Sequence, residues 1–215
     1  MDLPPHVDKL ISAVLKTQPD AIIVTQAGNP IRMPWRHSAK SMIHSWYGGN
    51  EAGNAVADVL FGRINPSGKL PMTFPDRLED NPAFLSFGSD NGKVHYSEGV
   101  FVGYRWYETR RIMPAFPFGA GAEVIQMYIR YFAVSQDSKF ARPRQELKGF
   151  KKIYLEPGER KLATIPIDKY STAVWDEKRN SWCCEKGDYL VNVVSATEGL
   201  MGSFKIEKSI FWNGL

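Results

Sequence analysis

Three carboxylates on segments that we expect to be ordered have the chemistry of general acids, bases or nucleophiles: Glu51, Asp58 and Glu98. Glu51 is expected in the first turn of a helix, where the helix dipole stabilises a negative charge. Asp58 lies two turns further along the same helix, where we expect it to be solvated. Glu98 is predicted to pair with Arg105 and to anchor the surrounding segment. These contexts favour structural roles, and no two carboxylates are evidently preorganised as a catalytic pair.

The other reactive residue types form no catalytic or metal-binding pattern either. No two histidines have the spacing of a helical metal pair, and the serine motif Gly-x-Ser-x-Gly does not occur. Cys183 and Cys184 are adjacent, so they indicate neither a disulfide framework nor a metal site. The sequence therefore predicts no catalytic residue, no cofactor-binding residue and no metal ligand, and it implies no cofactor. The histidines are His6, His37, His44 and His95.

Aromatic residues make up 13% of the 215 residues, and they admit two interpretations. Exposed rings could line a sugar site, because the C–H faces of sugars stack on aromatic rings. Buried rings would instead fill a core, which is the commoner arrangement and the one we favour. The candidates for either role are Trp35, Trp46, Tyr47, Trp106 and Tyr107.

Composition and charge are those of a soluble globular protein, with 43% hydrophobic residues, 23% charged residues and a net charge of +4. No apolar stretch is long enough to span a membrane, and the first residues do not form a signal peptide, so the compartment stays open. No nucleic-acid motif accompanies the densest basic run, which we interpret as a solvated strand edge. Its members are Arg142, Arg144, Lys148, Lys151 and Lys152.

The first third of the chain has the pattern of a wound α/β domain, which we place at residues 1–75. Residues 4–17 are predicted to form an amphipathic helix, and residues 21–28 (AIIVTQAG) a buried parallel strand. Residues 41–46 (SMIHSW) are ambiguous between helix and strand, and we predict a strand because a helix clearly follows.

That next helix belongs to the most informative stretch of the chain, WYGGNEAGNAVADVLFGRINPSGKLPMTFP, residues 46–75. Gly48 and Gly49 permit a turn in which one of them needs a positive φ angle or a close backbone contact. Asn50 is expected to cap the helix, and Gly62 to end it. The small apolar residues at helical spacing predict a helix that lies close to a sheet.

The rest of the chain changes character twice. Residues 76–118 carry little regular signal and are predicted to form an ordered, aromatic-rich linker. From residue 119 onward, short alternating runs separated by turns indicate a β-sandwich. The predicted strands include residues 123–129, 147–150, 187–196 and 202–210, together with two runs around a Pro157-Gly158 turn in KKIYLEPGERKLATIPI.

Taken together, these motifs closely resemble glycoside hydrolase family 3, the fungal β-glucosidases in particular. The resemblance rests on AIIVTQAGNPIRMPW, the 46–75 stretch, VHYSEGVFVGYRWYE, FPFG and the C-terminal runs EVIQMYI, RPRQELKGFKKIYLEPGE and WCCEKGDYLVNVV. It implies a partial α/β sandwich domain, a linker, and a fibronectin type III-like β-sandwich over residues 119–215.

The resemblance also implies two absences. Family members begin with a barrel that carries the nucleophilic aspartate, and the acid/base glutamate precedes a segment similar to MDLPP. We therefore expect both catalytic carboxylates to be missing here. In the family, several dozen residues with the first strands of the sandwich follow FPFG, whereas Gly119 here runs almost directly into Ala122. The fibronectin type III-like domain is therefore expected to be incomplete.

Three functions follow from this pattern. The resemblance implies a β-glucosidase that hydrolyses terminal β-D-glucosyl residues, with a β-glucoside or oligosaccharide as substrate, although this polypeptide alone is predicted to be inactive. A second possibility is a non-catalytic carbohydrate-binding or interaction module. The third is a truncated product with no independent function. Neither nucleic acid nor a membrane is an expected partner, and exposed strand edges are expected to favour self-association.

Overall fold

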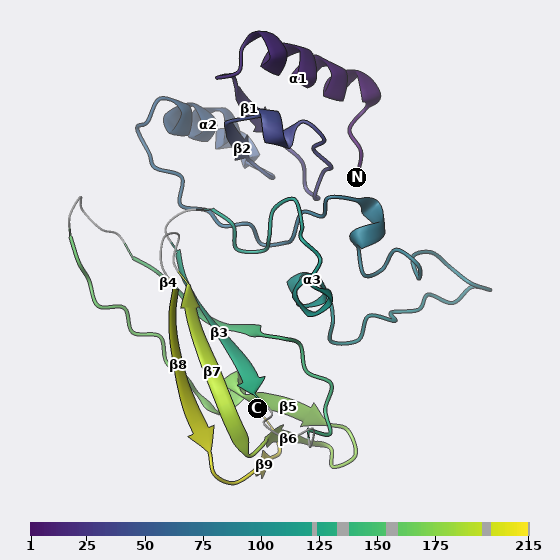
Figure 1. Ribbon diagram of the computed structural model, residues 1–215, viewed down its shortest axis with the longest axis vertical. Coiled ribbons are helices and arrows are strands. Elements are labelled where there is room, and N and C mark those ends of the chain that lie inside the picture. The colour runs from purple at the N-terminus through teal and green to yellow at the C-terminus, as the bar shows by residue number, and fades with distance from the viewer. Residues whose placement is uncertain (122–123, 133–137, 154–158, 195–198, 215) are drawn as a thin grey trace. The chain divides into compact units, whose positions relative to one another are not determined.

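The computed structural model describes residues 1–121, 124–132, 138–153, 159–194 and 199–214, and its backbone clusters into two compact units (Figure 1). Unit 1 comprises residues 1–66, 70–97 and 113–118. Unit 2 comprises residues 67–69, 98–112 and 119–215. The predicted order, a mixed α/β part followed by a β part, is confirmed.

Unit 1 contains two helices and a small parallel sheet. Helix α1 spans Pro5–Thr17 with a proline in its first turn, as predicted. Strands β1 (Ile22–Thr25) and β2 (Ser41–His44) pair in parallel, so the ambiguous segment is a strand. Helix α2 spans Ala52–Leu60. Three short 3-10 helices complete the unit: η1 (Arg36–Ser38), η2 (Gly49–Glu51) and η3 (Leu78–Asp80).

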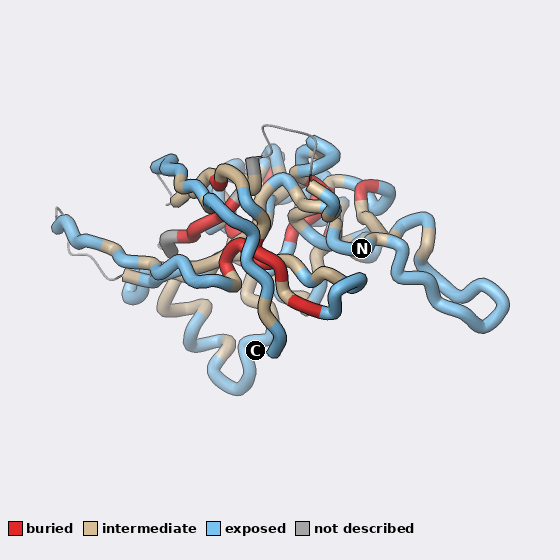
Figure 2. The backbone as a smooth tube through the Cα atoms, turned by 90° about the horizontal axis from the view of Figure 1, so that it is seen from below, coloured by how far each residue is buried: buried red, intermediate tan, exposed pale blue. Residues whose placement is uncertain are grey.

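The core of unit 1 leaves some apolar side chains of α1 and β1 uncovered. Its buried members are Leu15, Ile31, Met33, Trp35 and Phe74. The prediction that β1 is a buried strand is wrong. Its side chains alternate between exposed and half-buried along the strand. Apolar side chains on α1 and β1 therefore remain open to solvent, and in Figure 2 the buried stretches are short. The exposed ones are Leu10, Val14, Ile22 and Val24.

The turn before α2 uses its two glycines differently. Gly49 has a φ of +61°, where a Cβ atom is strongly disfavoured. Gly48 has an ordinary φ, but a Cβ atom there would lie 2.3 Å from the Cβ atom of Ala52. The predicted cap by Asn50 is wrong, because the chain makes the 3-10 helix η2 first and no side chain caps α2. Gly62, with a φ of +69°, follows the helix end as predicted.

Valine at either glycine is therefore expected to destabilise unit 1. At Gly49 the cost comes from the positive φ angle, and at Gly48 from the collision with Ala52; about 1–3 kcal/mol is expected for each. Thermal unfolding of Gly48→Val and Gly49→Val measures the loss. Gly53→Ala is the control, because Gly53 lies within α2 with open space around it, and alanine favours a helix. Unchanged stability of both valine variants would show that the turn is an ordinary one.

Unit 2 is built on an antiparallel sheet of four strands. Strands β3 (Val124–Phe132), β4 (Glu146–Lys152), β7 (Gly187–Val194) and β8 (Gly199–Ile206) lie in the order β4-β3-β7-β8. All four overlap predicted strands. The predicted limits are shorter for β3 and β4, and the strand predicted over residues 202–210 starts late and runs past the end of β8 at Ile206. Helix α3 (Tyr104–Arg110) belongs to the same unit and was not predicted, because the linker around it has little helical periodicity.

A second, three-stranded sheet in unit 2 was not predicted. Strands β5 (Ala173–Asp176), β6 (Ser181–Cys184) and β9 (Ile210–Trp212) pair antiparallel, after the 3-10 helix η4 (Lys169–Ser171). Their register places Trp175 opposite Trp182, and Trp182 opposite Trp212.

The strand predicted after the Pro157-Gly158 turn is wrong. Residues 159–168 form no strand in the structure, and the turn itself lies outside the described residues. Strand β4 pairs with β3 alone, and β3 also pairs with β7. In the described part of the chain, no strand pairs with residues 161–167, so their alternation does not become a strand.

Candidate functional site

Two of the carboxylates singled out from the sequence have structural partners. Glu51 accepts a hydrogen bond of 2.6 Å from the side-chain amide of Asn54. The carboxylate of Asp58 is paired with Arg63 at 3.1 Å and its side chain is 31% exposed, so Asp58 is partly solvated, as expected, but also has an ionic partner. Both residues stabilise the two ends of α2 locally, which agrees with the structural role preferred for Glu51.

The predicted ion pair of Glu98 is also wrong. Arg105 pairs instead with Glu146 on β4, at 3.0 Å, and so ties α3 to the four-stranded sheet. The backbone carbonyl of Glu98 accepts a hydrogen bond from the amide of Phe101, within a turn. Among the described residues, no hydrogen bond or ion pair brings Glu51, Asp58 and Glu98 together.

His44 is a structural histidine. Its Nδ1 atom is hydrogen-bonded to the Thr25 hydroxyl at 2.9 Å, and its Nε2 atom to the carbonyl of Ala27 at 3.1 Å. Burial lowers its pKa, against the opposing effect of the Ala27 hydrogen bond. Within the described ranges, no group of three or more His, Cys, Asp or Glu side chains is placed to hold a metal ion.

The five aromatic candidates divide between core and surface. Trp35 and Tyr107 are buried, Trp46 and Trp106 are half-buried, and Tyr47 is 83% exposed. Core packing thus accounts for most of this set, and Tyr47 is the member that a ligand could reach.

The basic run has two different environments. Lys151 and Lys152 lie exposed on β4, the edge strand of its sheet, as expected. Arg142, expected in solvent, is largely buried: its Nε and Nη2 atoms donate to one oxygen of Glu185 at 3.0 and 2.7 Å. The Arg142 guanidinium also lies 4.6 Å from the centre of the Tyr131 ring.

A half-buried polar cluster between α3 and β4 was missed by sequence reasoning. Glu108 accepts a hydrogen bond of 2.8 Å from Gln145, and its second oxygen is buried without a hydrogen-bond partner. The Tyr104 hydroxyl accepts from the amide of Leu147 at 2.7 Å. The i, i+4 spacing of Tyr104 and Glu108 was the available signal. Because these groups face each other across packed elements, the cluster holds α3 on the sheet.

Burial raises the pKa of Glu108, and the Gln145 hydrogen bond only partly offsets this. A carboxyl whose folded pKa exceeds its unfolded value loses stability as the pH rises through the window between them. We therefore expect Glu108→Gln to be more stable than the parent at pH 7, with a difference that shrinks as the pH falls below 4.5, the ordinary value. Urea unfolding at several pH values measures the difference. A difference independent of pH would contradict the assignment.

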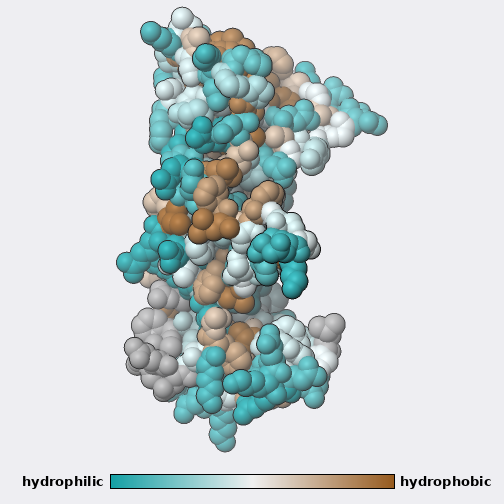
Figure 3. Space-filling view, turned by 90° about the vertical axis from the view of Figure 1, so that its right-hand side faces the viewer, coloured by the Kyte–Doolittle hydropathy of each residue, from teal (hydrophilic) through white to brown (hydrophobic). Residues whose placement is uncertain are grey.

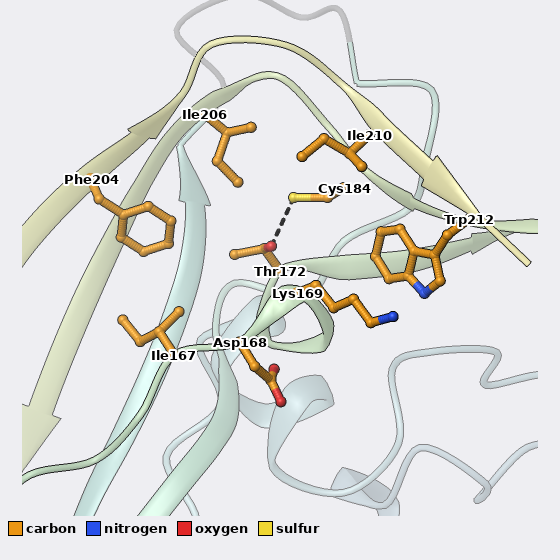
Figure 4. A pocket seen from close by; sticks show the side chains of 9 residues that line it. All are labelled: Ile167, Asp168, Lys169, Thr172, Cys184, Phe204, Ile206, Ile210 and Trp212. Atoms are coloured by element: carbon orange, nitrogen blue, oxygen red, sulfur yellow. Dashed lines mark hydrogen bonds between the residues drawn. The ribbon is translucent and has the colours of Figure 1, made fainter. Parts of the chain in front are cut away.

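A pocket of about 230 Å³ in unit 2 is lined by residues of both sheets (Figure 4). Figure 4 shows the Asp168 carboxylate directed away from Cys184 and Phe204, so the pocket wall is almost entirely apolar. Its lining residues are Ile167, Asp168, Lys169, Thr172, Cys184, Phe204, Ile206, Ile210 and Trp212.

Two polar groups at this pocket are hydrogen-bonded, whereas the indole Nε1 of Trp212 is buried without a hydrogen-bond partner among the described residues. The Asp168 carboxylate accepts hydrogen bonds from the amides of Tyr170 and Ser171 at the start of η4, and the Ser171 side chain is the main reason that its pKa is lowered. The Cys184 thiol is hydrogen-bonded to the Thr172 hydroxyl at 2.8 Å. The volume of the pocket is below that of typical ligand pockets, so it suits apolar side chains. Its single carboxylate caps η4, so the pocket lacks the pair of carboxyl groups that glycoside hydrolysis needs.

No described helix has the length and apolar character that crossing a bilayer requires.

Two family models match the sequence. Residues 1–104 match the glycosyl hydrolase family 3 C-terminal domain, and residues 123–197 match the fibronectin type III-like domain.

Relatives at 40–45% identity align with the whole chain. One is a protein of Emericella nidulans named probable beta-glucosidase K, which is 45% identical over 248 aligned positions. A solved structure of a beta-glucosidase from Kluyveromyces marxianus in complex with glucose has a TM-score of 0.91 at 40% identity. A beta-glucosidase 3B from Thermotoga neapolitana has a TM-score of 0.86 at 29% identity. The chain spans 29% of the first relative, and 30% and 35% of the two solved chains.

Proposed function

Because the chain belongs to glycosyl hydrolase family 3, with its C-terminal domain and its fibronectin type III-like domain, we propose that it works as the C-terminal part of a β-glucosidase. The reaction is hydrolysis of terminal β-D-glucosyl residues with retention, through a glycosyl-enzyme intermediate. The observation that carries this proposal is the 45% identity to a probable beta-glucosidase over the whole chain. We place the α/β part at residues 1–75, the linker at 76–118 and the sandwich at 119–215.

The same proposal holds that this 215-residue polypeptide alone is catalytically incompetent. A retaining glycosidase needs two carboxyl groups about 5 Å apart, one as nucleophile and one as acid/base. Glu51 is hydrogen-bonded to Asn54 on α2, and Asp58 is paired with Arg63, just after that helix. The pocket of unit 2 has a single carboxylate, which caps η4. We assign no catalytic residue, no cofactor and no metal ligand to this chain.

The open apolar side of unit 1 supports a role as one part of a larger catalytic assembly. Leu10 and Val14 on α1, and Ile22 and Val24 on β1, are exposed. On the face drawn in Figure 3, apolar residues form several patches among hydrophilic ones. Contiguous apolar surface in a globular protein commonly marks an interface. We propose that this side of unit 1 is covered by another part of the active enzyme.

Purified chain incubated with an aryl β-glucoside is therefore expected to release no more aglycone than a buffer blank. The positive control is the probable beta-glucosidase K of E. nidulans, assayed at equal molar concentration. Turnover that Glu51→Gln or Glu98→Gln abolishes would overturn the proposal and show an active site within this chain.

A carbohydrate-binding or interaction module is the second candidate, and the exposure of Tyr47 favours it. Isothermal titration with cello-oligosaccharides distinguishes the candidates. Affinity without turnover, lost in Tyr47→Ala, would support a binding module. Absence of both affinity and turnover would leave either a part that works only within a larger enzyme or a product with no independent function.

A further inference from the structure

The loops that follow strands β1 and β2 lie at the end of the unit 1 sheet where α/β proteins commonly bind ligands. The two strands are parallel, so their carboxyl ends share one edge of the sheet (Figure 1). In open α/β sheets, ligands bind in the crevice outside the carboxyl ends of the strands. Residues 26–30 follow β1 at this edge, and residues 45–51 follow β2. A ligand of unit 1 would therefore contact side chains of these two loops.

Hydrogen bonds between the ends of the two strands hold these loops in one arrangement. His44, the last residue of β2, is hydrogen-bonded through Nε2 to the carbonyl of Ala27 at 3.1 Å. The amide of Ser45 donates to the carbonyl of Thr25, the last residue of β1, at 2.9 Å. A side chain carried by either loop is therefore presented from a fixed backbone, which limits the entropy lost on binding.

Trp46, in the second loop, has an unusual backbone conformation. Its φ angle is +46°, in the left-handed region that residues other than glycine rarely adopt. The Trp46 ring packs edge-on against His44 and Phe74, with centroid distances of 4.4 and 5.8 Å, so the core of unit 1 holds it in place. Strained residues of this kind cluster at functional sites. The turn sends the Trp46 ring to the core and leaves the next ring, that of Tyr47, in solvent.

The Tyr47 ring is seated on the loop after β1. A Cβ atom at Gly28 would lie 1.8 Å from the Tyr47 hydroxyl oxygen and 2.0 Å from its Cζ atom, so the hydroxyl end of the ring occupies space that only glycine leaves open. Tyr47 is nevertheless 83% exposed. The ring is thus held at one end by the backbone of Gly28, while most of its surface is free. It offers a flat and rigid surface on which the C–H face of a sugar can stack.

Amide side chains accompany this ring in both loops. Gln26 and Asn29 lie within two residues of Gly28, and Asn50 follows Tyr47 by three residues. All three amides are exposed, and none is hydrogen-bonded to another described residue. A primary amide both donates and accepts hydrogen bonds, as sugar hydroxyl groups do. The two loops contain no basic residue, and their one charged side chain is a carboxylate, so they suit an uncharged polar ligand rather than an anion.

We propose that Tyr47 and the amide side chains of the two loops bind one pyranose ring of a β-glucoside. The C–H face of the sugar stacks on the Tyr47 ring, and its hydroxyl groups hydrogen-bond to the amides. The choice of ligand rests on the proposed function, because membership of glycosyl hydrolase family 3 makes a glucoside the uncharged polar ligand to expect. The loops hold no pair of facing carboxyl groups, so the site binds the sugar without cleaving it.

Titration of the full 215-residue chain with cellobiose tests the proposal, with binding followed by saturation-transfer NMR of the sugar. A single stacked sugar ring is expected to bind with a Kd of about 1–10 mM. Tyr47→Ala removes the stacking surface and is expected to weaken binding about fivefold or more. Tyr47→Phe retains the ring, so a change of less than about threefold is expected. Tyr96→Ala is the matched control, because Tyr96 is 88% exposed but lies outside the two loops, and binding should be unchanged.

Gly28→Ala tests whether the seat of the ring matters for binding. The added methyl group displaces only the free end of the Tyr47 side chain, so thermal stability should be unchanged while affinity falls about as far as in Tyr47→Ala. In the Tyr47→Ala background the same substitution has no ring to displace. The double variant Gly28→Ala, Tyr47→Ala is therefore expected to bind cellobiose as Tyr47→Ala alone does.

The proposal is overturned if no saturable binding occurs up to about 50 mM cellobiose, or if Tyr96→Ala weakens binding as much as Tyr47→Ala does. Additive effects of Gly28→Ala and Tyr47→Ala in the double variant would overturn it as well. The proposed function has its own readout in the same samples, the release of aglycone from an aryl β-glucoside. Release would contradict the inactivity proposed for this chain, whereas the sugar site stands or falls on the binding data.

Discussion

Replacing Arg142 with methionine is expected to lower the free energy of unfolding of unit 2 by about 3 kcal/mol, because it leaves a buried carboxylate without its partner. The side chains of Arg142 and Glu185 are only 12% and 13% exposed, and two guanidinium nitrogens donate to the same Glu185 oxygen. Glu185 also accepts a hydrogen bond from Ser138, which cannot replace the lost positive charge. Urea unfolding followed by tryptophan fluorescence measures the change.

Two controls separate the loss of the pair from a loss of packing. Arg142→Met combined with Glu185→Met removes both charges, and most of the stability is expected to return. Lys40→Met breaks the Lys40–Asp20 pair of unit 1, which is exposed, and a change below about 0.5 kcal/mol is expected. If Arg142→Met lowers the free energy of unfolding by no more than Lys40→Met does, the buried pair contributes no more to stability than an exposed one.

The sequence predicted the elements whose periodicity is unambiguous. Strands β3 and β7 alternate over most of their length, and α1 has helical spacing with proline in its first turn, so local pattern and tertiary partner agree. Strands β5 and β6 were missed because AVWD and SWCC are too short and too uniformly apolar to alternate. Helix α3 was missed because seven residues in an aromatic-rich linker hardly differ from a loop.

Partners distant in sequence could not be predicted. Arg142 and Glu185 are 43 residues apart, and a basic run is usually solvated, so nothing local distinguishes the one buried arginine from the exposed lysines beside it. The same limit applies to residues 161–167. Their alternation predicts a strand, but a strand also needs a neighbour to pair with, and the described part of the chain supplies none.

Insertion of a relative's extra residues between Gly119 and Ala122 is expected to raise the stability of unit 2 by several kcal/mol. The parent should be poorly soluble or self-associating, and cleaved early after residue 119, because apolar side chains and unpaired backbone groups are exposed. Covering several hundred Å² of apolar surface, at about 25 cal/mol per Å², contributes several kcal/mol, which is comparable with the stability of a small domain. Solubility, thermal unfolding and limited proteolysis of both proteins measure the difference.

The insertion would begin from a part of the chain that side-chain hydrogen bonds hold in place. Lys69 donates to the carbonyls of Gly119 and Gly121, so the chain on the Gly119 side is held in place and a linked segment starts from a fixed point. Glycine-serine residues of equal length are the control, since they supply length without apolar side chains. The chain without the insert could instead prove monomeric, cooperatively folded and protease-resistant across residues 120–215. This result would show that its own strands close a core unaided, and the insert should then add no stability.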